Sequence, residues 1–382
     1  LSWDDGTPQS FEWDGRNDAG ALVPDGVYSY RVESVDRAGN TIQNTLQNII
    51  VNTQATPIGL GIDRSFFSPN DDGRADTISF RPTVPVSSGL ISWTIEVYQD
   101  TNGAPVRSIE GFDPPGERVQ FDGRADNGAV LAEGSYRGRL TVRYRNGNQP
   151  EEVSPRFTID LTSPTAEVRA DEEIFSPNAD GNKDIVSFFQ DGSEEERWTG
   201  EILDDDGELV RSFSYIGVPA FREQWDGQLD GGQRAADGLY RYRLRSEDRA
   251  GNRGVSNTVE FRLDTSETPI LLSAEYGSFS PNGDGVRDRI RLFPELERNE
   301  GIADFTLEVV GLREDDSTQQ VFRVRGQDSL DPEYSWNGRT PDGLPARDGR
   351  YLARLEVVYT NGNEEQSQTQ PFVIDTRYPQ VE

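Results

Sequence analysis

The chain carries the stretch Phe67-Ser68-Pro69-Asn70-Asp71-Asp72-Gly73-Arg74-Ala75-Asp76. Its pattern, Phe-Ser-Pro-Asn-x-Asp-Gly-x-x-Asp, returns from Phe175 to Asp184 and again from Phe279 to Asp288. The copies lie at nearly regular intervals, which is typical of an array of similar modules. A single active site is not distributed in this way, so the pattern indicates a structural module with its own loop of oxygen-bearing side chains.

A second block of sequence repeats between the copies of the first. It begins Trp13-Asp14-Gly15-Arg16, continues through Asp25-Gly26-Val27-Tyr28 and closes at Asp36-Arg37-Ala38-Gly39-Asn40. Variants of it begin at Phe121, Trp225 and Trp336, and the distance from this aromatic residue to the tyrosine is the same in every copy. Fixed spacing of this kind confirms a repeat protein at the level of sequence.

The two blocks together divide the chain into repeats. Residues 1–54 match only the second half of a repeat, and full repeats are predicted at 55–162, 163–266 and 267–382. Each has the size of one immunoglobulin-like β-sandwich. The chain ends where another repeat would begin, so we expect it to be a segment of a longer polypeptide.

The distance from each second block to the next first block is constant, although it crosses the boundary between repeats. A flexible linker would tolerate changes of length. The constant joint, marked by Asp160-Leu161-Thr162-Ser163-Pro164 and by Asp264-Thr265-Ser266, therefore predicts a fixed geometry between repeats and a stiff array.

Within the repeat at 55–162 the sequence predicts short strands separated by turns. Leu90 to Tyr98 alternates, with Ile91, Trp93, Ile95 and Val97 on one face. Thr101-Asn102-Gly103 and Asn146-Gly147 are expected hairpin turns, and Glu152 to Ile159 is expected to be one strand. No segment has helical periodicity. The predicted fold class is all-β, a tandem array of immunoglobulin/fibronectin-like antiparallel β-sandwiches.

Composition narrows the possible functions. The net charge is −30, with 38 basic and 68 acidic residues, which argues against nucleic acid or an anionic membrane surface as a partner. Cys and His are absent, so disulfides cannot form and most acid–base and nucleophilic schemes are excluded. We therefore expect no enzymatic activity and no membrane insertion in this segment.

The Phe-Ser-Pro-Asn loops offer ligands of the kind that Ca²⁺ prefers, namely carboxylate, amide and hydroxyl oxygens around a glycine. Their spacing matches the first part of an EF-hand loop and then departs from it, because the closing Glu is missing. The alternative is an Asx-rich turn whose side chains bond their own backbone. On the metal interpretation up to three Ca²⁺ ions bind, one to each set of predicted ligands: Ser68, Asn70, Asp72 and Asp76; Ser176, Asn178, Asp180 and Asp184; Ser280, Asn282, Asp284 and Asp288.

The constant joint suggests how such an ion could act. If the loop lies near the end of the preceding repeat, a cation there could bridge Asp160 or Asp264 to the next repeat and stiffen the array. The second block has a structural explanation instead. Its aromatic residue behaves as a core residue, and its tyrosine is expected to fix a corner, as in immunoglobulin-like domains.

The second block resembles the immunoglobulin-like domain of flagellar hook-capping proteins, and the Phe-Ser-Pro-Asn pattern resembles the start of repeats in bacterial surface and gliding-associated proteins. The resemblance covers essentially the whole chain. It implies the sandwich fold and a module used as a spacer, anchor or scaffold in unrelated proteins.

We therefore expect a structural or adhesive segment of a large exported bacterial protein, located outside the cell, on its surface or in the periplasm. Its partners would be the neighbouring repeats, with other surface proteins or polysaccharide as further candidates. The alternatives are a carbohydrate- or protein-binding accessory module of a larger surface enzyme and a flagellar hook-associated scaffold. Carbohydrate binding would need exposed aromatics, whereas Trp93, Trp198 and Phe305 occupy matching strand positions that indicate core.

Overall fold

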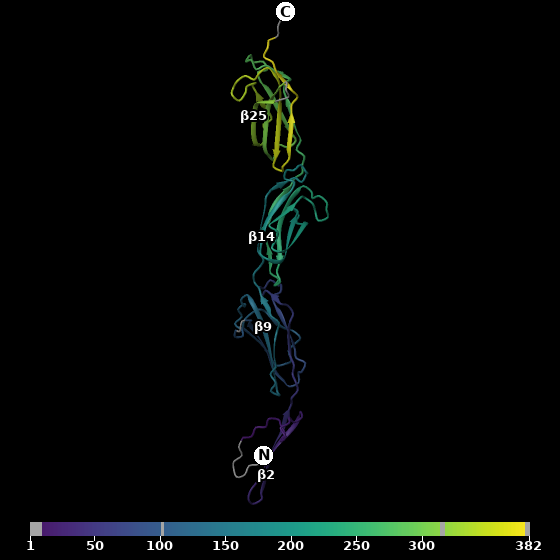
Figure 1. The fold of residues 1–382 in the computed structure, drawn as a ribbon, viewed down its shortest axis with the longest axis vertical. Coiled ribbons are helices and arrows are strands. Elements are labelled where there is room, and N and C mark those ends of the chain that lie inside the picture. The colour runs from purple at the N-terminus through teal and green to yellow at the C-terminus, as the bar shows by residue number, and fades with distance from the viewer. Residues whose placement is uncertain (1–9, 101–102, 314–317, 379–382) are drawn as a thin grey trace. The chain divides into compact units, whose positions relative to one another are not determined.

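The computed structural model describes residues 10–100, 103–313 and 318–378, which form strands, turns and irregular connections without any helix (Figure 1). Within these ranges, no helix long and apolar enough to cross a membrane occurs. The chain divides into two compact units, Leu1–Thr162 with Arg249–Asn252, and Ser163–Asp248 with Arg253–Glu382.

The first sandwich contains a three-stranded and a six-stranded sheet. The strands of the smaller sheet, in spatial order, are β3 (Gly59–Ile62), β5 (Ile78–Thr83) and β8 (Val119–Phe121). Those of the larger sheet are β4 (Phe66–Phe67), β11 (Phe157–Ile159), β9 (Gly134–Tyr144), β6 (Leu90–Gln99) and β7 (Arg107–Gly111), with β10 (Glu151–Val153) beside β9. All pairs are antiparallel except β4 with β11, so the first strand of the sandwich changes sheet and pairs in parallel with the last.

The second and third sandwiches repeat this topology. In the second sandwich, the smaller sheet consists of β12 (Ala166–Ala170), β14 (Val186–Gly192) and β17 (Arg222–Trp225). Its larger sheet consists of β13 (Ile174–Phe175), β20 (Val259–Leu263), β18 (Gly238–Glu247), β15 (Glu195–Leu203) and β16 (Leu209–Gly217), with β19 (Arg253–Val255) beside β18. In the third sandwich, the smaller sheet consists of β21 (Ile270–Ala274), β23 (Ile290–Leu296) and β26 (Tyr334–Trp336). Its larger sheet consists of β22 (Ser278–Phe279), β29 (Phe372–Ile374), β27 (Gly349–Tyr359), β24 (Ile302–Leu312) and β25 (Thr318–Asp328), with β28 (Glu364–Gln368) beside β27.

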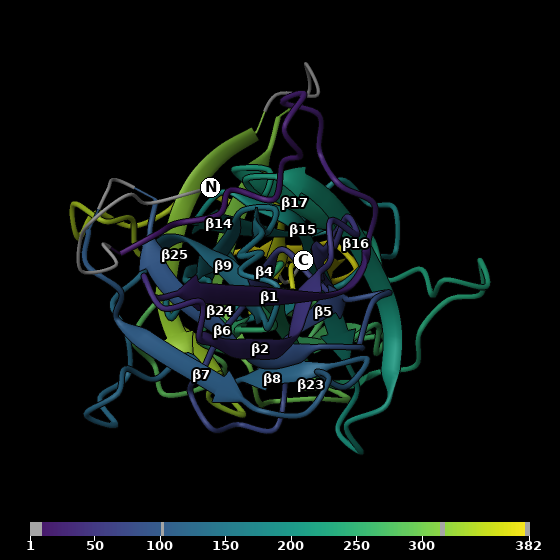
Figure 2. The ribbon, with the colours of Figure 1, turned by 90° about the horizontal axis from the view of Figure 1, so that it is seen from below.

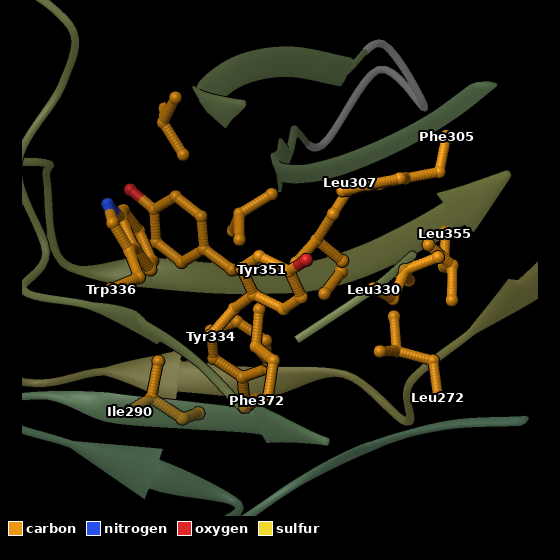
Figure 3. Packing of buried hydrophobic residues seen from close by; sticks show 14 of the residues in the cluster. Leu272, Ile290, Phe305, Leu307, Leu330, Tyr334, Trp336, Tyr351, Leu355 and Phe372 are labelled. Carbon is orange, nitrogen blue, oxygen red and sulfur yellow. The ribbon is translucent and has the colours of Figure 1, made fainter. Parts of the chain in front are cut away.

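This arrangement confirms the predicted fold class of tandem immunoglobulin/fibronectin-like sandwiches. Each sandwich has its own core, made from the inward faces of both sheets. In the third, Trp336 packs against Tyr351 and Phe372 in this cluster (Figure 3). The residue boundaries between repeats stay a prediction.

Residues 10–54 contain a single antiparallel pair, β1 (Gly26–Val35) and β2 (Thr41–Val51), which run side by side in Figure 2. Apolar side chains of this ribbon such as Ile42 and Leu46 are exposed. The block-opening aromatic is fully buried at Phe121, Trp225 and Trp336, as expected of a core residue, whereas Trp13 remains 38% exposed.

Alternation along β6 follows the prediction at three of its four apolar positions. Trp93, Ile95 and Val97 are buried, but Ile91 is 48% exposed. The pairing of β6 with β9 shifts register between Leu90 and Ser92, and this bulge turns Ile91 outward. The expectation for Ile91 was wrong because a local bulge reverses the face of the residue beside it.

The predicted strand from Glu152 to Ile159 is divided into β10 and β11. Ser154 lies between them, fully buried, and its Oγ accepts the Gly138 N–H at 2.9 Å in place of a ladder carbonyl. The turn at Asn146-Gly147 is present, with Gly147 at φ +87°. Residues 101–102 of the other predicted hairpin turn, Thr101-Asn102-Gly103, lie outside the described residues.

The tyrosine of each second block fixes a corner, as predicted. Tyr136, Tyr240 and Tyr351 each donate a hydrogen bond to the backbone carbonyl four residues earlier, at 2.9, 2.7 and 2.7 Å. Tyr28 makes the same contact with Pro24. The bond closes the connection that leads into the long central strand, which is the role of the tyrosine corner in immunoglobulin-like domains.

Candidate functional site

The Phe-Ser-Pro-Asn loop opens each repeat in sequence but lies at the end of the sandwich where the chain leaves it. The parallel pairing of β4 with β11 brings Phe67 beside Asp160, whose N–H donates to the Phe67 carbonyl at 3.2 Å. Asp264 and Asp375 bond Phe175 and Phe279 in the same way. Each loop therefore adjoins the last residues of its own repeat, not the end of the preceding repeat on which the bridging hypothesis relied.

The predicted ligands of the second loop form a set of interlocking Asx turns. Asn178 Oδ1 accepts the Asp180 N–H at 3.1 Å, and Asp180 Oδ1 accepts the Asn182 N–H at 2.7 Å. The two carboxylate oxygens of Asp184 accept the N–H groups of Ala179 and Gly181 at 2.6 and 2.9 Å. The Asn178 amide also donates to Asp180 Oδ2 at 2.8 Å. These side chains therefore hold the loop backbone in place.

The same bonds recur in the other two loops. In the third, Asp284, Val286, Gly283 and Gly285 donate their N–H groups to Asn282, Asp284 and Asp288 at 2.7–3.1 Å. The first loop differs at one contact, because Asp76 receives the Gly73 N–H on Oδ2 while Oδ1 is buried without a partner. The structure thus brings Asn and both Asp residues of each predicted set together in one turn.

The predicted serine ligands behave differently. Ser68 and Ser176 are fully buried, and neither Oγ has a hydrogen-bond partner in the structure. No group of three or more acidic side chains placed to hold a metal ion occurs in the described residues. The donor set fits a cation in part: orphaned oxygens are present, but the Asn and most Asp oxygens already accept backbone N–H groups.

A left-handed residue closes each loop. Ala75, Lys183 and Arg287 have φ of +46°, +47° and +53°, and their carbonyls accept the Ser68, Ser176 and Ser280 N–H groups at 2.9–3.0 Å. Such a conformation costs a residue with a side chain about 1–2 kcal/mol. It recurs at the same position in all three loops, so we infer that loop geometry matters enough to hold this strain.

The first Phe-Ser-Pro-Asn loop contacts residues 249–252. In the first compact unit, the Asn70 amide donates to Asn252 Oδ1 at 3.2 Å, and the Asn252 amide donates to the Asp160 carbonyl at 2.9 Å. The Arg249 guanidinium lies over the Phe66 ring, 5.6 Å from its centre. Asn252 is 1% exposed and Ala250 is fully buried. Within this unit the loop therefore holds the tetrapeptide 249–252.

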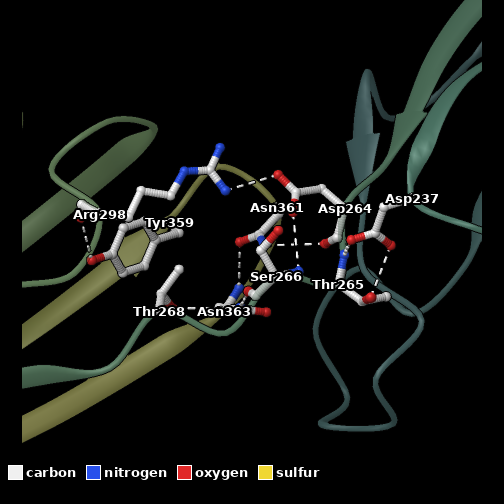
Figure 4. A network of polar contacts seen from close by, with 9 residues as sticks. All are labelled: Asp237, Asp264, Thr265, Ser266, Thr268, Arg298, Tyr359, Asn361 and Asn363. Carbon is white, nitrogen blue, oxygen red and sulfur yellow. Dashed lines mark hydrogen bonds and ion pairs between the residues drawn. The ribbon is translucent and has the colours of Figure 1, made fainter.

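Equivalent contacts cross the joint at Asp264–Thr268 in the second unit. The Asn361 and Asn363 amides donate to the Asp264 and Ser266 carbonyls at 3.2 and 2.9 Å (Figure 4). Asn363 also lies within reach of Thr268 Oγ1 and accepts from the Asn178 amide at 3.2 Å. Both asparagines are buried.

The joint before the first sandwich uses the same arrangement. The Asn146 amide donates to the Asn52 carbonyl at 3.4 Å, and the Asn148 amide donates to the Gln54 carbonyl at 2.9 Å and to Thr56 Oγ1 at 3.2 Å. In each joint, then, a hairpin ending in Gly-Asn donates side-chain hydrogen bonds to the connecting backbone.

A second set of joint contacts was not predicted from the sequence. Asp25, Asp237 and Asp348 each accept both the N–H and the hydroxyl of a joint threonine: Thr53, Thr265 and Thr376. In the first sandwich Glu133 takes this place and bonds the Leu161 N–H and Thr162 Oγ1, both at 2.7 Å. These bonds hold the pKa of Glu133 below its ordinary value. The recurrence of threonine just after each repeat was the available signal.

One ion pair joins the second joint to the third sandwich. Arg298 Nη1 lies 2.9 Å from Asp264 Oδ2, and the Arg298 carbonyl accepts the Tyr359 hydroxyl at 3.0 Å (Figure 4). Burial alone would raise the pKa of Asp264, but hydrogen bonds from Ser266 and the charge of Arg298 outweigh it and lower the pKa. Asp264 is therefore ionised under ordinary conditions.

The aromatic residues considered for carbohydrate stacking lie in the cores. Trp93, Trp198 and Phe305 are 8%, 0% and 5% exposed. The structural interpretation of these three positions is confirmed, and they offer no platform to a sugar.

Comparisons with known proteins give distant similarities. No family model and no curated protein matches the chain. Among solved structures, a tetra-tandem repeat from the extending region of a large adhesion protein shares 15% identity over 93% of this chain and 83% of that one, with a TM-score of 0.34. A structure concerned with host cell surface retention of a 1.5-MDa bacterial ice-binding adhesin shares 14% identity over 85% and 98%, with a TM-score of 0.37.

Fibronectin(III)-like modules of Clostridium thermocellum CbhA share 14% identity over 53% of this chain and 92% of theirs, with a TM-score of 0.30. At such identities and scores a likeness carries no argument about function.

Proposed function

We propose that this chain is a structural segment of an exported bacterial surface protein, in which immunoglobulin-like sandwiches act as spacers with joints of fixed orientation. The observation that carries the proposal is the shared joint chemistry. Asn146 with Asn148, and Asn361 with Asn363, donate to the connecting backbone in the same pattern. A flexible linker would not need buried side chains that form hydrogen bonds with its backbone.

The composition supports a role outside catalysis and away from nucleic acid. The chain has no His and no Cys, and its net charge is −30. Such a charge favours a hydrated, soluble surface. Partners of this segment would be its own neighbouring repeats, with other surface proteins or polysaccharide as further partners.

The test is whether the joint asparagines set the orientation of adjacent sandwiches. Because the chain lacks cysteine, spin labels can be placed selectively at Thr258→Cys and Gln370→Cys, both exposed and in the second and third sandwiches. We expect a narrow distribution of label-to-label distance by electron double resonance. Replacing Asn361 and Asn363 together with Ala should broaden it and leave the circular dichroism unchanged.

The matched control is Asn337→Ala, an exposed turn asparagine of the third sandwich that bonds only its own turn. It should leave the distance distribution narrow. A broad distribution in the unmodified chain would contradict a fixed joint and with it the spacer function, and equal widths in the unmodified chain and the double joint variant would show that the asparagines do not set the orientation.

A second proposal concerns calcium. We propose that the loops bind up to three Ca²⁺ ions and that binding stiffens the joints that adjoin them. The buried Ser68 and Ser176 hydroxyls and the buried Asp76 Oδ1, all without partners, support a missing ligand at these loops. The predicted sets named above would supply the protein oxygens, and backbone carbonyls or water would complete them.

Calcium titration by calorimetry on the full chain tests this, with melting followed with and without chelator. We expect saturable binding, a higher melting temperature in calcium and weaker binding in Asp180→Asn. Magnesium is the control, because an acidic chain attracts any divalent ion. No saturable heat at millimolar calcium would leave the loops as Asx turns, and the spacer proposal would stand without metal.

A further inference from the structure

The outer face of the larger sheet carries the same pair of residues in every sandwich. A Thr-x-Glu sequence lies on β6, β15 and β24, and an arginine of the neighbouring long strand stands directly opposite the glutamate. The three pairs are Glu96 with Arg139, Glu201 with Arg243, and Glu308 with Arg354. In the first two sandwiches the ion pair is closed, at 2.6 and 2.9 Å. Such a cross-strand pair is an ordinary structural feature of a sheet.

The third sandwich leaves this pair open. On the other side of β24, β25 places Arg323 opposite Glu308, and the Arg323 guanidinium lies 3.0 Å from the carboxylate. Arg354 is exposed and forms no ion pair within the described residues. The other sandwiches have Ser108 and Ser212 at the position of Arg323. An arginine added on one side of the glutamate thus frees the arginine on the other side.

A second arginine of β25 lies on the same face. Arg325 stands opposite Thr306, at a position where the first two sandwiches have Glu110 and Ser214. It is exposed and has no ion pair in the part of the chain that the structure describes. The spacer role is common to all three sandwiches, so it does not account for two arginines that only the third adds.

The three arginines of β25 and β27 line a groove of about 610 Å³. The other polar groups of its lining are hydroxyls, amides and carboxylates: Thr306, Glu308, Glu356, Gln366, Ser367 and Gln368. With three arginines and two glutamates, the lining has a net charge of +1 in a chain whose net charge is −30. The groove is therefore a local excess of positive charge, and its volume suits a small ligand.

The lining selects the chemistry of that ligand. A guanidinium binds a carboxylate through two parallel N–H bonds, so Arg325 and Arg354 favour an anionic group. Ionised glutamate only accepts hydrogen bonds, so Glu308 and Glu356 favour a ligand that also donates. Leu355, the one apolar residue of the lining, belongs to the core cluster, which leaves no apolar wall for an aliphatic or aromatic ligand. A saccharide that carries carboxylates meets all three conditions.

We infer that this groove is a binding site for an acidic saccharide, whose carboxylates meet Arg325 and Arg354 and whose hydroxyls donate to Glu356. The inference rests on the proposed function and deepens it, because it names a class of polysaccharide that an exported segment would meet. An acidic peptide fits less well, since its carboxylates come without hydroxyls beside them. The net charge opposes long polyanions, but salt screens charges beyond about 8 Å, so a short stretch of sugar responds mainly to the groove.

The test is binding of a short oligogalacturonate to the full chain, followed by the fluorescence anisotropy of a labelled sugar. The buffer contains EDTA, so that divalent ions cannot bridge two acidic polymers. We expect saturable binding that weakens roughly tenfold in Arg354→Gln and in Arg325→Gln, as for the loss of one charged hydrogen-bonded contact. No saturable binding to the unmodified chain, or equal affinity in both variants and the unmodified chain, would overturn the site.

The matched control is Arg143→Gln. Arg143 is exposed on the outer face of β9 in the first sandwich, and it too has no ion pair among the described residues. This variant loses the same charge and should bind the sugar as the unmodified chain does. Substitutions at such exposed positions rarely disturb folding, which circular dichroism checks.

Two further ligands test the chemical class. The methyl ester of the same oligosaccharide keeps the hydroxyls and loses the charge, and it should bind roughly tenfold more weakly or worse. Oligoglutamate keeps the carboxylates and lacks the hydroxyls, and it should also bind more weakly. Affinity for either ligand equal to that for the oligogalacturonate would show that the groove does not select an acidic saccharide.

Failure of this inference can be told apart from failure of the proposed function. Every residue of the groove lining belongs to the third sandwich, so sugar binding does not depend on the joints. A narrow label-to-label distance without sugar binding would defeat only the groove. A broad distance with sugar binding intact would defeat only the fixed joint.

Discussion

Asparagine suits the joints because its side chain donates and accepts hydrogen bonds at the same time. Asn363 gives its amide hydrogens to the Ser266 carbonyl and takes the Asn178 amide on its oxygen. Aspartate in that place could not donate, and alanine would leave the Ser266 carbonyl without that partner. A single buried residue therefore links a loop, a joint and a hairpin.

The tyrosine corner gives a prediction at this scale. Tyr240→Phe removes the 2.7 Å bond to the Ala236 carbonyl and keeps the buried ring. We expect the free energy of unfolding of the second sandwich to fall by about 1 kcal/mol, measured by denaturant titration. Tyr378→Phe, at a tyrosine that is 78% exposed, is the control and should change it by less than about 0.5 kcal/mol. Equal effects would show that the corner bond is dispensable.

At the scale of elements, the joints combine a threonine held by its own repeat with carbonyls held by the next hairpin. Thr265 is bonded to Asp237, while the flanking Asp264 and Ser266 carbonyls accept from Asn361 and Asn363 (Figure 4). In the first sandwich Glu133 makes the threonine contact one residue later, at Thr162, because its side chain is longer. The joint therefore tolerates a change of residue that preserves the reach of the carboxylate.

The ion pair of Asp264 with Arg298 makes this joint sensitive to acid. The pKa of Asp264 is lowered in the folded state from its ordinary value of 3.8, so the pair stabilises the joint above that pH. This contribution is lost as the pH falls from about 4 through the folded-state pKa.

Melting of the unmodified chain and of Arg298→Gln, followed from neutral pH to pH 2, measures the effect. We expect the difference between them to shrink below about pH 4, since Gln cannot favour the ionised carboxylate. A difference that stays constant over this range would exclude the ion pair as its source.

Local patterns predicted most strands, and their failures have local causes. The alternation of Trp93, Ile95 and Val97 placed β6 correctly, but nothing in the residues marked the bulge that exposes Ile91. Likewise, Ser154 looks like one more strand residue, and only the structure shows its hydroxyl replacing a ladder bond between β10 and β11. Bulges and side-chain substitutes for backbone bonds leave weak traces in a sequence.

At the scale of the whole molecule, internal repetition was the strongest predictor. It gave the sandwich fold and the recurrence of the joints without any information from relatives. The contact that the first loop makes was not predicted, because Asn70 meets Asn252 across 182 positions of sequence. Spacing can show that a joint is constant; it cannot show which side chains meet there.

The position of the loop illustrates the same limit. In sequence it opens a repeat, and the parallel pairing of β4 with β11 carries it to the opposite end of the sandwich, beside Asp160. Because parallel strands end at the same edge of a sheet, the loop after β4 lies beside the residues after β11. Whether calcium also binds there stays a prediction.

Asn361-Gly362 has a chemical consequence beyond its hydrogen bonds. Asn-Gly steps deamidate when the glycine nitrogen attacks the side-chain amide carbon, and asparagine is among the thermolabile residues. Here that nitrogen is engaged with the Tyr359 carbonyl at 3.0 Å and Asn361 is 2% exposed. A closed joint thus protects Asn361 from deamidation. A joint that stays open would convert it to a carboxylate that cannot donate to the Asp264 carbonyl, and the opening would become permanent.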